Sequence, residues 1–143
     1  MADGFERVYV ELECYDGPRA GIADIHGVPH RFKSNFDEND GASLDGTFSV
    51  FAIDIDVLKL EREQWRLFVT WNRRYERGEE VDSRHPGHGG VDPHWDELDR
   101  LLDESRSSMP HDARKARAER LWLDRKQRYT EDGPDYRLRW TLL

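Results

Sequence analysis

The sequence predicts a single α+β domain in which two helices pack on one face of an antiparallel sheet of about six strands. Three observations support this prediction. Several short runs alternate apolar and polar residues, as half-buried strands do. Two longer runs carry apolar residues at helical spacing between capping signals. The order of these runs is β-β-β-β-α-α-β-β, which is typical of helices that cover one face of an antiparallel sheet.

Length and composition agree with one globular domain. The chain has 143 residues, and its apolar residues are periodic and include five tryptophans, so it does not read as disordered. No apolar stretch approaches the roughly 20 residues of a membrane span, and residues 1–7 lack the pattern of a signal peptide. Cys14 is the only cysteine, which excludes an internal disulfide and a Cys-based zinc cluster. We therefore expect a cytoplasmic protein that does not bind a membrane.

The first third of the chain predicts a three-stranded meander. In residues 7–14, four apolar side chains alternate with polar ones and should share one buried face: Val8, Val10, Leu12 and Cys14. A Gly-Pro turn leads to a strand at residues 21–25, and a His-Gly turn leads to the next at residues 28–33.

A loop and a fourth strand follow the meander. Residues 34–46 are acidic and rich in turn formers, so we expect a solvated loop there. Residues 47–53 are apolar on both faces, which indicates a central strand or one covered by a helix.

A long amphipathic helix is predicted from Val57 to about Arg77. Asp54 and Asp56 can cap its N-terminus, and Gly78 ends it. Its apolar residues span an arc of about 200°, which is wider than a surface helix needs. We therefore expect this helix to lie across the sheet and also to contact the second helix.

The second helix is predicted from Asp92, as N-cap, to about Arg106, with Pro93 in its first turn. Its narrower apolar stripe consists of Trp95, Leu98, Leu101 and Leu102. A C-terminal hairpin should follow, with strands at residues 115–129 and 136–142. The inward residues of the last strand should be Tyr136, Leu138, Trp140 and Leu142.

The net charge of −8 is unevenly distributed. Residues 1–105 carry 12 basic and 24 acidic side chains, whereas residues 106–143 carry 10 basic and 6 acidic ones. An acidic chain disfavours nucleic-acid binding, because that affinity depends on neutralising phosphates. Nucleic-acid binding through the basic C-terminal hairpin is therefore the least favoured of the possible functions.

Two groups of residues could carry chemistry. The first is a His-rich loop, in which His85, His88 and His94 could bind zinc; the alternative is a polar loop with exposed histidines. Asp92 lies in the same stretch, but its role as a helix cap occupies its oxygens. Phosphate-loop, nucleophile-elbow, His-Glu-x-x-His and dinucleotide motifs are absent from the sequence, which favours a protein that is not an enzyme and needs no cofactor.

The second group consists of polar residues on apolar faces. Glu61, Gln64 and Asn72 fall inside the apolar arc of the long helix, and His30 lies on the apolar side of its strand. A buried carboxylate needs a partner, and His30 or Arg19 could supply one for Glu61. The outcome would be either an internal network that fixes packing or a polar pocket beneath the helix. The residues of this candidate polar pocket are Arg19, Asp24, His30, Glu61 and Asn72.

Residues 15–24 (YDGPRAGIAD) and 27–32 (GVPHRF) resemble a type of small bacterial hypothetical protein. The resemblance extends to the helix with Trp65 and Trp71 and to His85-Pro86, and so covers most of the chain. It implies a bacterial cytoplasmic origin and no particular activity.

These observations favour a non-catalytic interaction protein, immunity-like or regulatory. Its acidic residues, including the loop at residues 37–45, would suit a basic protein partner. The alternative is a small metal-dependent or acid/base enzyme, which would use the His-rich loop or a Glu61–His30 pair.

Overall fold

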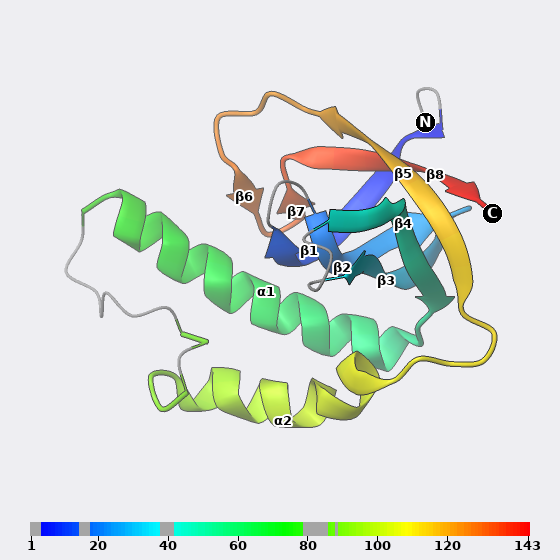
Figure 1. The fold of residues 1–143 in the computed structure, drawn as a ribbon. Helices are drawn as coiled ribbons and strands as arrows, with labels where there is room; N and C mark the ends of the chain where they lie inside the picture. The colour runs from blue at the N-terminus through cyan, green and yellow to red at the C-terminus, as the bar shows by residue number, and fades with distance from the viewer. Residues whose placement is uncertain (1–3, 15–17, 38–41, 79–85, 88) are drawn as a thin grey trace.

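The computed structural model describes residues 4–14, 18–37, 42–78, 86–87 and 89–143. Six antiparallel strands form a closed barrel, and two helices lie together along one side of it (Figure 1). A small two-stranded sheet lies beside the middle of the longer helix. The prediction of an α+β fold with six antiparallel strands and two helices on one face is confirmed. Among the described residues, none of the helices has the length and apolar character needed to cross a membrane.

The barrel follows the chain in a simple meander. Its strands in order are β1 (Glu6–Cys14), β2 (Pro18–Ile25), β3 (Val28–Asp37), β4 (Ala42–Ala52), β5 (Arg114–Trp122) and β8 (Tyr136–Leu142). Antiparallel pairing of β1 with β8, at Glu6 with Leu138 and Arg7 with Arg137, closes the sheet. The helices are inserted between β4 and β5, so they leave the order of neighbouring strands unchanged.

The hairpin of β3 and β4 is longer than predicted. Residues 34–37 and 42–46, expected in a solvated loop, belong to these two strands, with Asp37 paired to Ala42. Asn35 supports the extension, because its amide nitrogen donates to the Thr47 hydroxyl (3.0 Å) and its oxygen accepts from Ser49 (2.8 Å). Asn35, which lies in the predicted loop, therefore bonds across the hairpin to two side chains of β4.

A bulge divides the apolar face predicted for β1. The pairing of β1 with β2 shifts register between Val8 and Val10, which turns one of the two side chains to the opposite face. Val8 packs inside the barrel, Val10 packs outside it against the longer helix, and Leu12 is 38% exposed. For this reason, the prediction that these residues share one buried face was wrong. The side chain of Cys14 lies outside the described residues.

The barrel interior is an apolar core with an aromatic centre. Phe32, Phe48 and Trp140 form a cluster with ring centroids 5.4–5.7 Å apart. Tyr136 and Leu138 are buried, and Trp140 and Leu142 pack against the same core, so the inward face predicted for the last strand is confirmed. The described core residues carry no charge, so the charged side chains lie on the outer surface and in the helix layer.

Helix α1 (Ile55–Glu76) begins and ends close to the predicted residues. The Asp54 side chain caps it by accepting from the backbone N–H groups of Asp56 and Val57, and Arg77 is the C-cap before Gly78. Its buried apolar residues pack on the outside of the barrel against Val10 and Ile22; they are Leu58, Trp65 and Val69. Burial of this face against β1 and β2 fixes α1 across the barrel.

Helix α2 (Pro93–Ser107) is also capped as predicted, since Asp92 accepts from the N–H groups of His94 and Trp95. Its buried apolar residues are Leu98 and Leu102, whereas Leu101 is 47% exposed. The apolar stripe is therefore narrower than expected, and α2 contacts the rest of the molecule along one edge.

The chain after β5 does not continue as the predicted strand to residue 129. It leaves the sheet after Trp122 and forms a small hairpin, β6 (Tyr129–Thr130) with β7 (Gly133–Pro134). Asp135 holds the departing segment, because its carboxylate accepts from the backbone N–H and the guanidinium of Arg125 (3.2 and 2.9 Å). The indole N–H of Trp65 donates to the Thr130 carbonyl (2.7 Å) and ties this hairpin to α1.

Candidate functional site

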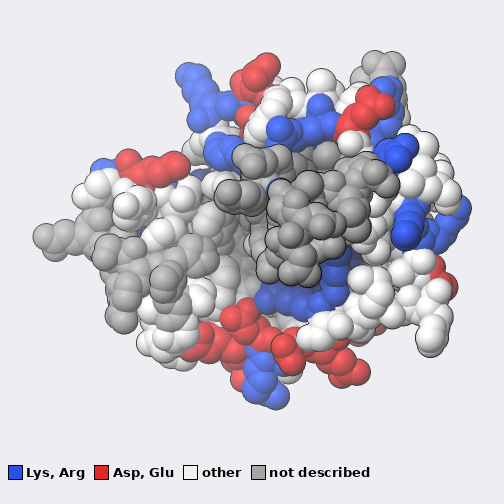
Figure 2. Space-filling model, in the orientation of Figure 1, with Lys and Arg blue, Asp and Glu red and all other residues white. Residues whose placement is uncertain are grey.

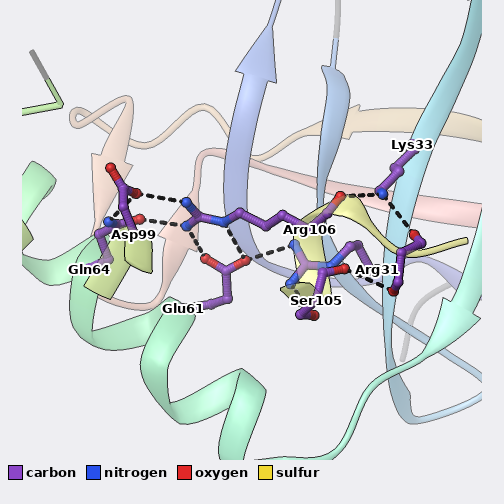
Figure 3. A network of polar contacts seen from close by, with 8 residues as sticks. Arg31, Lys33, Glu61, Gln64, Asp99, Ser105 and Arg106 are labelled. Carbon is purple, nitrogen blue, oxygen red and sulfur yellow. Dashed lines mark hydrogen bonds and ion pairs between the residues drawn. The ribbon is translucent and has the colours of Figure 1, made fainter. Parts of the chain in front are cut away.

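Glu61 is the centre of a polar network between the barrel and the two helices (Figure 3). Its side chain has no exposed surface and lies on the buried face of α1, next to Leu58, Gln64 and Trp65. One carboxylate oxygen accepts from Nη1 of Arg31 on β3 (2.7 Å), and the other accepts from Nη2 of Arg106 on α2 (2.5 Å). One carboxylate thus binds both the barrel and the second helix to α1.

Arg106 extends the network along the interface of the two helices. Its guanidinium also donates to Asp99 (2.8 Å) and to the amide oxygen of Gln64 (2.5 Å), and Gln64 in turn donates to Asp99 (2.8 Å). Burial lowers the pKa of Arg106, but its hydrogen bonds and charge interactions with Glu61 and Asp99 outweigh this and raise it. Arg106 is therefore a permanent cation whose donors are used within the fold.

Lys33 lies two residues from Arg31 on the same side of β3. Its ammonium group donates to the backbone carbonyls of Arg106 and Ser108 (3.0 Å to Ser108), at the C-terminal end of α2. A cation here is favourable, because the last carbonyls of a helix lack partners and carry partial negative charge. Burial lowers the pKa of Lys33, and the nearby charge of Arg31 lowers it further.

A pocket of about 440 Å³ opens beside this network, and its lining is basic and partly apolar. The lining residues are Leu12, Ala20, Arg31, Lys33 and Arg106. Three cationic residues around one pocket create a positive potential in a chain whose net charge is −8. The arrangement can attract an anionic group, but it presents no nucleophile with an adjacent base.

The partners predicted for Glu61 were wrong. Its bonds come from Arg31 and Arg106 rather than from His30 or Arg19. His30 is directed elsewhere, and Nδ1 donates to the Val28 carbonyl (2.7 Å). Because the oxygens of Glu61 are occupied by guanidinium donors and closed to solvent, a Glu61–His30 acid/base pair does not exist in this structure.

The other residues of the candidate polar pocket are dispersed. Asp24 lies on β2 and accepts a hydrogen bond from Tyr9; burial raises the pKa of Tyr9, and Asp24 raises it further. Asn72 is half-buried near the far end of α1, and Arg19 lies on β2. Of the five predicted residues, only Glu61 belongs to the network described above.

The His-rich loop is described only in part, since His85 and His88 lie outside the described residues. His94 is half exposed, and its Nε2 lies 3.0 Å from a carboxylate oxygen of Glu63 on α1. Asp92 caps α2, as expected. Within the described part of the chain, no three His, Cys, Asp or Glu side chains are grouped as ligands of a metal ion.

The outer face of α2 is acidic and solvent-exposed. We use this name for the residues on the exposed arc of the helix: Asp96, Glu97, Arg100, Leu101, Asp103 and Glu104. Figure 2 shows acidic side chains along the edge of the molecule where α2 lies, with a group of basic side chains above them. Arg100 pairs with Glu97 (2.5 Å), while Asp103 and Glu104 form no ion pair with any other described residue. The outer face therefore has an excess of negative charge around the exposed Leu101.

The basic C-terminal strands form mostly internal contacts. Arg128 pairs with Glu11 (3.1 Å) and lies over the rings of Tyr129 and Trp122, with centroid distances of 4.6 and 5.1 Å. Arg139 pairs with Glu119 (2.6 Å). These arginines are engaged by acidic and aromatic side chains of the same domain, as expected for charge complementation within the fold.

Comparisons of the chain with protein-family models, with curated proteins and with solved structures found no match.

Sequence patterns identified Glu61 and Gln64 but missed the three cations of the site. Arg31 and Lys33 alternate with apolar residues on β3, which is the pattern of a solvent-facing side chain. Here that side of the strand is covered by the helices, and Arg31 is 1% exposed. A buried carboxylate on α1 implied a buried cation nearby, but the identity of that cation depended on which strand lies beneath the helix.

Proposed function

We propose that the protein is a non-catalytic interaction protein that binds a basic protein partner through the outer face of α2. The observation that carries the proposal is the exposed Leu101 on the same helix face as Glu97 and Glu104, in a region with excess negative charge. An apolar residue inside a polar rim is the general layout of a protein interface, and the acidic rim would complement a basic partner. An immunity-like or regulatory role in a bacterial cytoplasm, as the sequence favours, is part of this proposal.

The buried network supports the proposal by fixing the position of α2. Arg106 and Ser105 on the inner side of α2 bond to Glu61 and Arg31, so the helix is bound to both α1 and β3. A surface that is already rigid loses little conformational entropy when a partner binds. Fifteen helical residues span about 22 Å at 1.5 Å per residue, which is enough for a helical or extended basic segment to lie along the face.

The test measures, by fluorescence anisotropy, the binding of a designed basic helical peptide with lysines on one face and leucines on the other. We expect saturable binding that weakens as salt rises from about 50 to about 300 mM, because exposed charges are screened. A Glu97→Lys/Glu104→Lys variant should bind the peptide at least about tenfold more weakly than the wild type. A Leu101→Ser variant should also weaken peptide binding, although it leaves the charge of the protein unchanged.

The matched control is Glu76→Lys/Glu131→Lys, which changes the net charge equally at exposed positions outside α2. This control should bind like the wild type. If it loses as much affinity as the α2 variant, the peptide responds to the total charge, and the proposal is wrong. Concentration-dependent sedimentation of the free protein, abolished by the α2 variant, would instead identify a second copy of the chain as the occupant of this face.

A further inference from the structure

We propose that the pocket beside the Glu61 network is a binding site for the carboxylate group of a small organic acid. This inference is independent of the partner surface on α2, because the pocket lies over β1, β2 and β3 on the inner side of the helix layer. Its volume of about 440 Å³ is within the range of small-molecule sites, which is roughly 300–1,000 Å³.

The charges around the pocket leave room for one negative charge. Arg31, Lys33 and Arg106 are cations, whereas the described acidic residues that contact them are Glu61 and Asp99. One cation is in excess, so a monoanion would balance the group. Burial strengthens this preference, because charges that are removed from water interact more strongly.

The free donors around the pocket also match a carboxylate. Arg31 uses Nη1 on Glu61 and Nη2 on Ser105, but its buried Nε–H has no acceptor among the described residues. Lys33 has three N–H donors and uses two of them on the carbonyls of Arg106 and Ser108. The buried Nε–H of Arg31 and the third N–H of Lys33 can donate to the two oxygens of a carboxylate. The ammonium group of Lys33 would meet the ligand first, with Arg31 behind it at the floor of the pocket.

The rest of the pocket wall favours an organic acid over an inorganic ion. Leu12 and Ala20 also line the pocket and can contact a hydrocarbon chain. A dianionic phosphate would exceed the single excess charge and would have no use for the apolar wall. The predicted ligand is therefore an aliphatic monocarboxylate.

The experiment titrates the full-length protein with hexanoate, and with hexanamide as a ligand of the same shape without the charge. Calorimetry should show saturable binding of hexanoate and none of hexanamide. Nuclear magnetic resonance should show a shift of the Arg31 Nε–H signal as the site fills, because this donor gains an acceptor.

Three variants test the location of the site. Lys33→Met should weaken hexanoate binding about tenfold or more, since a charge-assisted hydrogen bond is lost. Lys126→Met, which removes an exposed lysine elsewhere, should bind like the wild type. Ala20→Phe fills the pocket and leaves every cation in place, so it should abolish binding even if Lys33→Met perturbs the end of α2.

Three results would each contradict the assignment of a carboxylate site to this pocket. Binding of inorganic phosphate as tight as that of hexanoate would exclude the carboxylate class. Equal binding by wild type and a folded Ala20→Phe variant would place the anion outside the pocket. Absence of saturable hexanoate binding to the wild type would remove the site altogether, whatever the outcome with the α2 peptide.

Discussion

Glu61 has no exposed surface, and its carboxylate contacts two guanidinium groups that come from different elements. A buried ion pair is costly to desolvate, so its net contribution to stability is small or uncertain when it is compared with an apolar alternative. The loss of one partner is a different matter, because the remaining charge stays buried and unpaired. Arg31, at 1% exposure, is in that position whenever Glu61 is neutralised.

Glu61→Gln should therefore lower the free energy of unfolding by about 3–5 kcal/mol, the usual cost of an uncompensated buried charge. Urea denaturation followed by circular dichroism measures the change. The matched control is Glu63→Gln on the same helix, whose 42% exposed side chain pairs only with His94 among the described residues. That exposed pair should contribute about 1 kcal/mol or less. Similar losses in both variants would show that the burial of Glu61 has no special energetic role.

Tyr9 should make the protein less stable at high pH. Its pKa is raised above the ordinary value of 10.0, first by burial and then by Asp24, so the folded state holds the phenolic proton more tightly than the unfolded state. The stability from this proton is complete below pH 10.0 and is lost as the pH rises through the folded pKa. In Tyr9→Phe, this part of the alkaline decline should disappear. Parallel stability curves of the wild type and Tyr9→Phe above pH 10.0, measured by urea denaturation, would contradict the assignment.

At the scale of the elements, α2 joins two different surfaces. Its inner side buries Leu98 and Leu102 and carries Arg106 into the polar network, while its outer side exposes Leu101. Leu101 and Leu102 are adjacent in sequence but should differ sharply in energetic role. This contrast separates the packing of the helix from its proposed docking function.

Leu102→Ala should cost about 2–5 kcal/mol of unfolding free energy, because it opens a cavity at a position with no exposed surface. Leu101→Ala should change stability by less than about 0.5 kcal/mol, as expected for an exposed substitution. The comparison requires only chemical denaturation of two variants. A large loss from Leu101→Ala would mean that this side chain has an internal partner and is not available to bind another protein.

Local signals predicted the elements of this fold well where they depended on neighbouring residues alone. Asp54, Asp92 and Pro93 marked the helix starts, since a cap acts on N–H groups two or three residues away. The alternation of the last strand likewise located its inward face. The bulge between Val8 and Val10 could not be predicted in the same way, because its register is set by the partner strand β2.

The candidate site shows the same limit. The sequence placed Glu61 on an apolar face, and burial required a charged partner for it. Which cation would be found there depended on the closure of the barrel and on the crossing of α1 over β1 to β3, and these are properties of the whole chain. The sequence therefore did not single out Arg31 or Lys33, which the structure covers with the helix layer.

For the molecule as a whole, the helices and the barrel depend on each other. The outer barrel residues Val10 and Ile22 are covered by α1, and α1 in turn buries its apolar residues against them and against Tyr129. Glu61 adds a polar connection to β3, and Trp65 adds another to the hairpin of β6 and β7. Removing either layer would expose apolar surface and leave buried charges without partners on the other.

We therefore expect the barrel and helices to unfold in one cooperative step. Native-state hydrogen exchange in low concentrations of urea should give the same opening free energy for the most protected amides of β3, β4 and α1. In Glu61→Gln these values should fall together, because the network joins α1 to β3, and β3 is paired with β4. Earlier opening of α1 and α2 at a free energy well below that of β3 would show instead that the barrel is stable alone. In that case the polar network would serve to position the helix layer, and its loss would impair binding on α2 more than the stability of the barrel.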